Sequence, residues 1–211
     1  MARFTNQAQL RYGNAVTNSN IAVGEILEVL SATKTAVRNT YGQSDTVTYI
    51  VSIVNSGTTP ITGISVTDNL GEYTFGTTTL VPLTYIDGTV KYYVNGVLQP
   101  SAVVTAGPPL VVSGITVPAG GSVTVAYEAA VNEFAPLDTT SVINNTAIVA
   151  GTGITPITAE EEITVESTPV LTITKSVSPV PVTENGTLTY TFLIQNSGNV
   201  AADASTGVVV T

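Results

Sequence analysis

The sequence predicts an all-β protein built from Ig-like Greek-key β-sandwich repeats. Three observations support this fold class. Apolar residues alternate with Thr, Ser and other polar residues at a period of two, turn sequences rich in Gly and Asn separate the alternating segments, and one stretch recurs within the chain. Alternation at a period of two is typical of strands that bury one face. The 211 residues, 43% of them hydrophobic and only 10% charged, are enough to form a core.

Strands and turns can be assigned in order along the chain. Residues 21–32 contain more Gly and β-branched residues than a helix favours, and no other segment keeps a helical stripe. Residues 46–54 and 121–127 alternate clearly, which predicts two half-buried strands. Between them, residues 85–98 contain Asp-Gly and Asn-Gly, which predicts a pair of hairpin turns. The run 160–162 consists of three glutamates, and we expect a solvated turn there rather than a cation site.

An internal repeat organises the chain. Residues 33–57 align without a gap onto residues 174–198, so every residue of the first stretch has its counterpart at one constant offset. At the N-terminus, residues 4–10 resemble residues 143–149, the last strand region of the first repeat. In sequence order, the chain is therefore expected to begin with the end of a repeat and to finish with the start of another.

This arithmetic predicts three parts. Residues 1–29 form an N-terminal extension and a candidate donor strand, residues 30–166 form a complete sandwich repeat, and residues 167–211 form the first strands of a second repeat. A fragment of about forty residues cannot bury the apolar faces of a sandwich. We therefore expect the second repeat to be completed either by further chain or by another molecule.

The composition excludes several classes of function. The sequence contains neither Cys nor His, so it provides no thiolate or imidazole for a zinc site, no disulfide and no Ser-His nucleophile. The net charge of -9 disfavours nucleic acid, and no apolar run is long enough for a membrane span. We expect no enzyme acting on a substrate, no metal and no cofactor.

Three polar side chains are expected to face the core. Lys34, Asp68 and Asn145 each share strand parity with apolar neighbours, and Lys175 occupies the repeat position of Lys34. Burial lowers the pKa of a lysine and raises that of an aspartate, so a neutral Lys34 is able to attack the Asn145 amide while Asp68 assists. The product is an intramolecular isopeptide bond. The alternatives are a buried Lys-Asp ion pair with Asn145 hydrogen-bonded nearby, or a lysine that extends to solvent.

The chain resembles a bacterial surface repeat family known as domain of unknown function 11, which is similar to other isopeptide-forming Ig-like modules. The resemblance covers residues 30–166 and 170–211. It implies an extracellular Ig-like sandwich that spaces, adheres or builds filaments. The residues that carry it are Ala32-Thr33-Lys34, Val47-Thr48-Tyr49, Asn55-Ser56-Gly57, Val66-Thr67-Asp68-Asn69-Leu70, Val117-Pro118-Ala119-Gly120-Gly121-Ser122-Val123-Thr124 and Asn145-Thr146-Ala147.

The expected function is that of a structural subunit of a bacterial surface fibre or a spore or cell appendage. Copies would assemble head to tail by strand addition, and Asn6 of one copy is a candidate for cross-linking to Lys175 of the next. The alternative is an adhesin or stalk module that binds a host or matrix ligand. Residues 1–7 lack the apolar segment of a signal peptide, so we expect an unconventional export route, such as assembly on a spore surface by the mother cell.

Overall fold

The structure is a computed structural model that describes residues 2–26, 29–100, 102–202 and 207–209. These residues form twenty strands and no helix, which confirms the all-β prediction. In this described part of the chain, no helix is long and apolar enough to cross a membrane.

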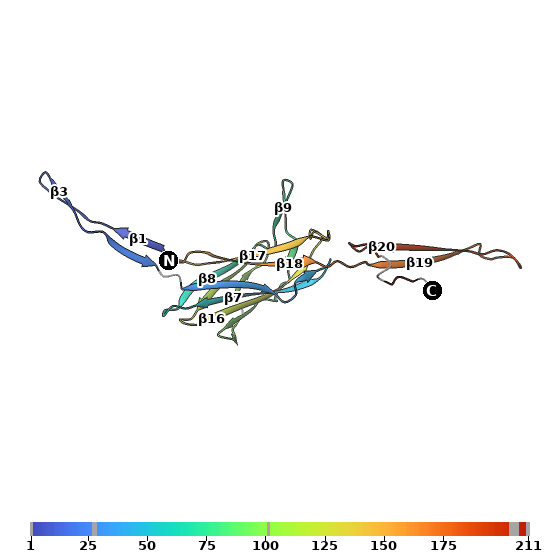
Figure 1. Cartoon of the computed structure of the whole chain (residues 1–211). Helices are drawn as coiled ribbons and strands as arrows, with labels where there is room; N and C mark the ends of the chain where they lie inside the picture. Colours follow the sequence, from blue (N-terminus) through green and yellow to red (C-terminus); the bar gives the residue numbers. More distant parts are fainter. Residues whose placement is uncertain (1, 27–28, 101, 203–206, 210–211) are drawn as a thin grey trace.

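The centre of the molecule is a sandwich of two six-stranded sheets (Figure 1). The first sheet has the order β13-β12-β16-β7-β5, with β11 also paired to β16, and the second has the order β14-β15-β8-β17-β18-β6. The strands of the first sheet are β5 (Leu30–Ala36), β7 (Thr46–Asn55), β11 (Leu83–Tyr85), β12 (Lys91–Val94), β13 (Val97–Leu98) and β16 (Ser122–Val131). Those of the second are β6 (Thr40–Tyr41), β8 (Ile61–Asp68), β14 (Val103–Thr105), β15 (Leu110–Val117), β17 (Val142–Ala150) and β18 (Ile157–Val165).

The core lies between these sheets and follows from the alternation in the sequence. Every second residue of β7 and β16 is buried, and the apolar residues of β8, β15 and β17 cover them from the other sheet. Burying one aliphatic side chain stabilises the fold by about 1.5–3 kcal/mol. A one-residue slip of any of these strands would therefore expose a whole row of core residues.

Two local predictions differ from the structure. The Asn95-Gly96 turn joins the hairpin of β12 and β13, but the Asp87-Gly88 turn does not join a hairpin, because β11 and β12 both pair with β16 instead of with each other. The solvated turn expected at residues 160–162 is wrong. These glutamates lie within β18, where Glu160 and Glu162 are exposed and Glu161 is half-buried on the side of Ala159. A run of three charges is compatible with a strand here because β18 pairs with its neighbours through its backbone and exposes one face.

Two-stranded elements project from the two ends of the sandwich (Figure 1). The N-terminal ribbon consists of the pair β1 (Ala2–Asn6) and β4 (Ala22–Ile26), followed outwards by β2 (Gln9–Tyr12) and β3 (Ala15–Asn18). The C-terminal hairpin consists of β19 (Leu171–Ser178) and β20 (Thr189–Asn196), and all residues of these two strands are exposed. A third, short hairpin of β9 (Tyr73–Phe75) and β10 (Thr78–Leu80) extends sideways.

The C-terminal hairpin has the same register as the first hairpin of the sandwich. Leu30 pairs with Asn55 in β5 and β7, and their repeat counterparts Leu171 and Asn196 pair with each other in β19 and β20. The turn after each hairpin is also alike, since Gly57 N donates to Asn55 Oδ1 at 2.9 Å and Gly198 N donates to Asn196 Oδ1 at 3.0 Å. The two repeats therefore share the register of their strand pairing as well as their sequence pattern.

The Asn55 turn generates a stability prediction. Asn55 is fully buried, and its Nδ2 donates to Thr59 O at 2.8 Å and to Val117 O at 3.3 Å. Asn55→Ala removes these bonds and takes a donor from the carbonyl of buried Val117, which should lower the free energy of unfolding by about 2–4 kcal/mol. Asn196→Ala is the matched control, because water replaces its exposed bonds, and should cost less than about 1 kcal/mol. Equal costs in urea denaturation would contradict the prediction.

Candidate cross-linking site

Four polar side chains from four strands meet inside the sandwich. Lys34 comes from β5, Asp68 from the end of β8, Tyr127 from β16 and Asn145 from β17. All four are buried, and the Lys34 side chain has no exposed area at all. The parity argument from the sequence places three of them inward, and the structure brings these three together with the tyrosine.

Asp68 is the centre of this cluster. Lys34 Nζ donates to Asp68 Oδ2 at 2.5 Å, and the Tyr127 hydroxyl donates to the same oxygen at 2.5 Å. Asn145 Nδ2 donates to the Tyr127 hydroxyl at 3.3 Å. A continuous chain of hydrogen bonds thus connects the amine to the carboxamide through a carboxylate and a phenol.

The loop after β8 supplies two backbone donors. Leu70 N donates to the second oxygen of Asp68 at 3.0 Å, and Gly71 N donates to Asn145 Oδ1 at 3.1 Å. Gly71 has a φ of 74°, and a Cβ at this residue would lie 2.6 Å from Ile143 Cγ2. Glycine is therefore required for the backbone N–H to reach the Asn145 carbonyl. An N–H in this position polarises the carbonyl and favours negative charge on its oxygen.

The buried environment of Lys34 lowers the pKa of its amine. Burial lowers the pKa of Lys34 from 10.5 to about 8, although the charge of Asp68 and its hydrogen bond oppose this shift. The ammonium lies 4.9 Å from the centroid of the Tyr49 ring, which stacks on Tyr127 at 5.7 Å. Burial raises the pKa of Tyr127 well above 10, and the charge of Asp68 adds to this, so Tyr127 remains a hydrogen-bond donor at neutral pH.

Sequence reasoning missed three residues of the site. Tyr127 and Gly71 resemble an ordinary core residue and an ordinary turn residue, and only the folded chain brings them to Asn145. Glu161 lies opposite Asn145 in the pairing of β17 with β18, and its charge is a smaller influence that raises the pKa of Lys34. The alternation of Glu161 with Ala159 and Ile163 was a signal that could have placed it on the inner face.

Asn6 and Lys175 do not meet within one chain. Asn6 ends β1 in the N-terminal ribbon, and Lys175 lies in β19 at the opposite end of the molecule (Figure 1). Lys175 nevertheless has the aromatic environment of its counterpart, because its Nζ lies 4.9 Å from the Tyr190 ring and 5.2 Å from the Phe192 ring. The second lysine is thus arranged like the first but is exposed.

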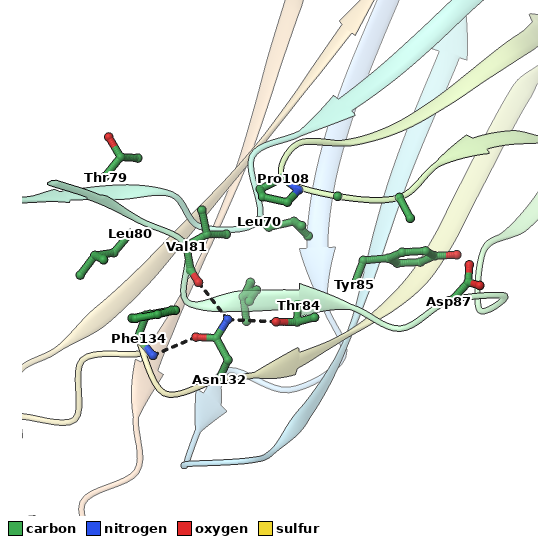
Figure 2. A pocket seen from close by; sticks show the side chains of 13 residues that line it. Leu70, Thr79, Leu80, Val81, Thr84, Tyr85, Asp87, Pro108, Asn132 and Phe134 are labelled. Atoms are coloured by element: carbon green, nitrogen blue, oxygen red, sulfur yellow. Dashed lines mark hydrogen bonds between the residues drawn. The ribbon is translucent and has the colours of Figure 1, made fainter.

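A groove of about 430 Å³ lies beside the base of the β9–β10 hairpin (Figure 2). Its lining is mostly apolar, and Asn132 is one of its polar side chains. Asn132 donates to Val81 O and Thr84 Oγ1 and accepts from Phe134 N, so its amide is already paired within the chain. No group of three or more Asp and Glu residues suited to a metal ion occurs in the described ranges.

Comparison with known proteins identifies the fold. No family model matches the chain, and no curated protein matches its sequence. Among solved structures, a variant of BcpA, the major pilin subunit of Bacillus cereus, matches 92% of this chain and 64% of its own at 9% identity, with a TM-score of 0.51. The major pilin SpaD of Corynebacterium diphtheriae matches 70% of this chain and 37% of its own, at 16% identity and a TM-score of 0.48. The pilus backbone protein RrgB of Streptococcus pneumoniae matches 57% and 31%, at 14% identity and 0.45.

The chain therefore spans between about a third and two thirds of the length of these proteins. At such low identity the match with BcpA establishes the fold class, an Ig-like β-sandwich, as the sequence predicted.

Proposed function

We propose that the chain is a structural subunit of an extracellular bacterial fibre or a spore or cell appendage, that it assembles head to tail by strand addition, and that an isopeptide bond stabilises its sandwich. The observation that carries the proposal is the presence of two exposed, apolar two-stranded elements at opposite ends of one sandwich (Figure 1). A contact between unlike ends of identical molecules does not close on itself and so produces a filament.

The exposed apolar side chains of these elements indicate that each element binds a further segment or molecule. Isolated two-stranded ribbons are marginally stable in water, and exposed apolar patches mark interaction sites. The ribbon exposes Phe4, Leu10, Tyr12, Val16, Ile21 and Val23, and the hairpin exposes Leu171, Ile173, Val177, Tyr190, Phe192, Leu193 and Ile194. Covering both sets requires either more chain or a second copy, and the complementary positions at the two ends favour the copy.

The buried cluster supports the isopeptide bond. Lys34 passes a proton to Asp68, and the neutral amine attacks Cγ of Asn145 while Gly71 N–H stabilises the developing oxyanion. Asp68 then returns this proton through Tyr127 to the departing Nδ2, which leaves as ammonia, and the regenerated carboxylate accepts the second amine proton. One C–N bond forms, one C–N bond breaks and one ammonia leaves, so the reaction needs no oxidant or cofactor.

Such a bond suits a fibre under tension. It joins β5, where the chain enters the sandwich, to β17, one strand before the chain leaves it. A pull along the fibre would then pass through the cross-link and leave residues 35–144 unextended. Where a carboxyl group stands in the position of Asp68, the same reaction would link Lys175 to Asn6 of the next subunit.

The location and the relatives form part of the same proposal. The fold occurs in pilus subunits such as BcpA, and membership of the surface repeat family domain of unknown function 11 is part of the proposal. Both agree with a subunit that acts outside the cell, on a cell or spore surface. Copies of the chain itself are the proposed partners.

The cross-link can be tested by mass. The intact protein should weigh one ammonia less per bond than its sequence, and peptide mapping should join Lys34 to Asn145. Lys34→Ala should restore the missing mass and lower the free energy of unfolding by about 4–5 kcal/mol, the loop-entropy value for a cross-link over about 100 residues. Lys175→Ala, the exposed repeat counterpart, is the control and should leave this bond intact. An unmodified mass in folded wild-type protein would contradict the bond.

The proton relay generates a second prediction. Tyr127→Phe keeps the ring but removes the hydroxyl that connects Asp68 to Asn145, so bond formation should slow by roughly 10- to 100-fold, as followed by mass spectrometry after refolding. In this slow variant the rate should rise with pH through about 8, because the free amine of Lys34 is the nucleophile.

Tyr49→Phe is the matched control for this experiment. The Tyr49 hydroxyl is buried close to Asn145 but, unlike that of Tyr127, makes no hydrogen bond to Asp68, so its removal leaves the relay intact and should not slow the bond. A Tyr127→Phe variant that forms the bond as fast as the wild type would show that the phenol of Tyr127 takes no part.

The fibre itself is the third prediction. The purified wild-type chain should form filaments one sandwich wide, visible by negative-stain electron microscopy and sedimenting at high speed. Dilution should not release monomers where subunits are covalently joined. A protein that remains monomeric at high concentration would contradict the proposed function.

A further inference from the structure

The N-terminal ribbon pairs its strands in the register of the last hairpin of the sandwich. Asn145 in β17 lies opposite Glu161 in β18, and Asn6 in β1 lies opposite Ala22 in β4. Asn6 precedes Asn145 in the sequence by the same number of positions as Ala22 precedes Glu161, so the two facing pairs correspond. The agreement holds for each facing pair from Arg3–Glu25 to Asn6–Ala22, and the β2–β3 pair beyond it is shifted by one residue.

One face of the ribbon carries a large apolar side chain at a position that is buried in the sandwich. In the sandwich, Ile143 and Ile163 face each other and both are buried. At the same positions of the ribbon, Phe4 faces Gly24, and the Phe4 ring occupies the space that a Cβ on Gly24 would need. One large and one absent side chain thus replace two of medium size, although Phe4 is 57% exposed in the single chain.

The C-terminal hairpin β19–β20 corresponds to β5 and β7, the pair whose first strand packs against the last hairpin of the sandwich. Its strands repeat β5 and β7, and the 4.9 Å distance from Lys175 to Tyr190 equals that from Lys34 to Tyr49. Within the sandwich, β18 packs against β5, and Asn145 is connected to Lys34 through a phenol and a carboxylate. In the hairpin, the place that β17 and β18 fill in the sandwich is open to solvent.

We propose that the β1–β4 pair of one copy occupies, beside β19 and β20 of the next copy, the place that β17 and β18 hold beside β5 and β7. This inference rests on the proposed function and specifies which segments meet. Because β17–β18 and β5–β7 belong to different sheets, the added ribbon strands complete the opposite sheet and contact β19 and β20 through side chains. Asn6 of one copy then lies over Lys175 of the next, as Asn145 lies near Lys34. The two partial elements together rebuild the first and last strands of one sandwich.

The register predicts which ribbon side chains are buried at the contact. Phe4 and Asn6 correspond to buried Ile143 and Asn145. Thr5 between them corresponds to an exposed residue of β17. The two ribbon faces should therefore differ in their tolerance of a charge.

The hairpin offers a matched pair of positions as well. Ile194 corresponds to fully buried Ile53, and Leu193 corresponds to half-buried Ser52. Ile194 and Leu193 are 48% and 55% exposed in the single chain, so exposure alone does not distinguish them. Only the proposed register predicts a difference between these neighbours.

Four full-length variants test this register. Phe4→Arg and Ile194→Arg place a charge in the proposed contact and should abolish filaments, because a buried unpaired charge is costly. Thr5→Arg and Leu193→Arg are their matched controls on the opposite faces and should form filaments like the wild type. All four positions are exposed in the monomer, so circular dichroism and the melting temperature should remain unchanged.

Mixing the two blocked variants gives a sharper result. Phe4→Arg keeps a working hairpin, and Ile194→Arg keeps a working ribbon, so an equimolar mixture should form heterodimers that grow no further, measured by analytical ultracentrifugation. Filaments that tolerate Phe4→Arg or Ile194→Arg, equal effects of variants and controls, or a monomeric mixture would overturn the register. A wild-type chain without filaments would contradict the proposed function as well, whereas filaments insensitive to these substitutions would overturn this inference alone.

Discussion

The hydrogen bond between Lys34 and Asp68 is the constraint on which the rest of the sandwich depends. It connects the two sheets at a point where neither charge reaches water, and an unpaired charge at this depth would be expensive. The bond therefore requires β5 and β8 to keep one register relative to each other. A slip of one residue in either strand would turn the charged side chain away from its partner and turn its apolar neighbours outward.

The other groups of the site are consequences of this pair. Tyr127 supplies a second hydrogen bond to the same carboxylate oxygen, and the turn after β8 brings Gly71 N–H to the Asn145 carbonyl. The same burial that makes the pair costly lowers the pKa of Lys34 and so increases the fraction of free amine. The contacts that bury Lys34 therefore affect both the stability of the fold and the reactivity of the Lys34 amine.

The two ends of the molecule repeat the internal registers of the sandwich. The β1–β4 pair follows the register of β17–β18, and the β19–β20 pair follows that of β5–β7. Each register places alternate side chains on one face of its strand pair, so faces that pack together within one chain can also pack together between two chains. In the proposed filament, the contact between subunits continues the fold instead of adding a separate interface.

The sequence by itself determined the all-β class and the inward parity of Lys34, Asp68 and Asn145, because both follow from local alternation. It also determined the constant offset between the two repeats, because that offset follows from comparing two stretches of the same chain. It did not determine the contribution of Tyr127 or the approach of Gly71 to the Asn145 carbonyl. Nor did it show that β11 and β12 share one neighbour across the Asp-Gly turn. Only the tertiary structure decided these points, because each depends on which strands become neighbours across the sandwich, and local patterns carry no information about that choice.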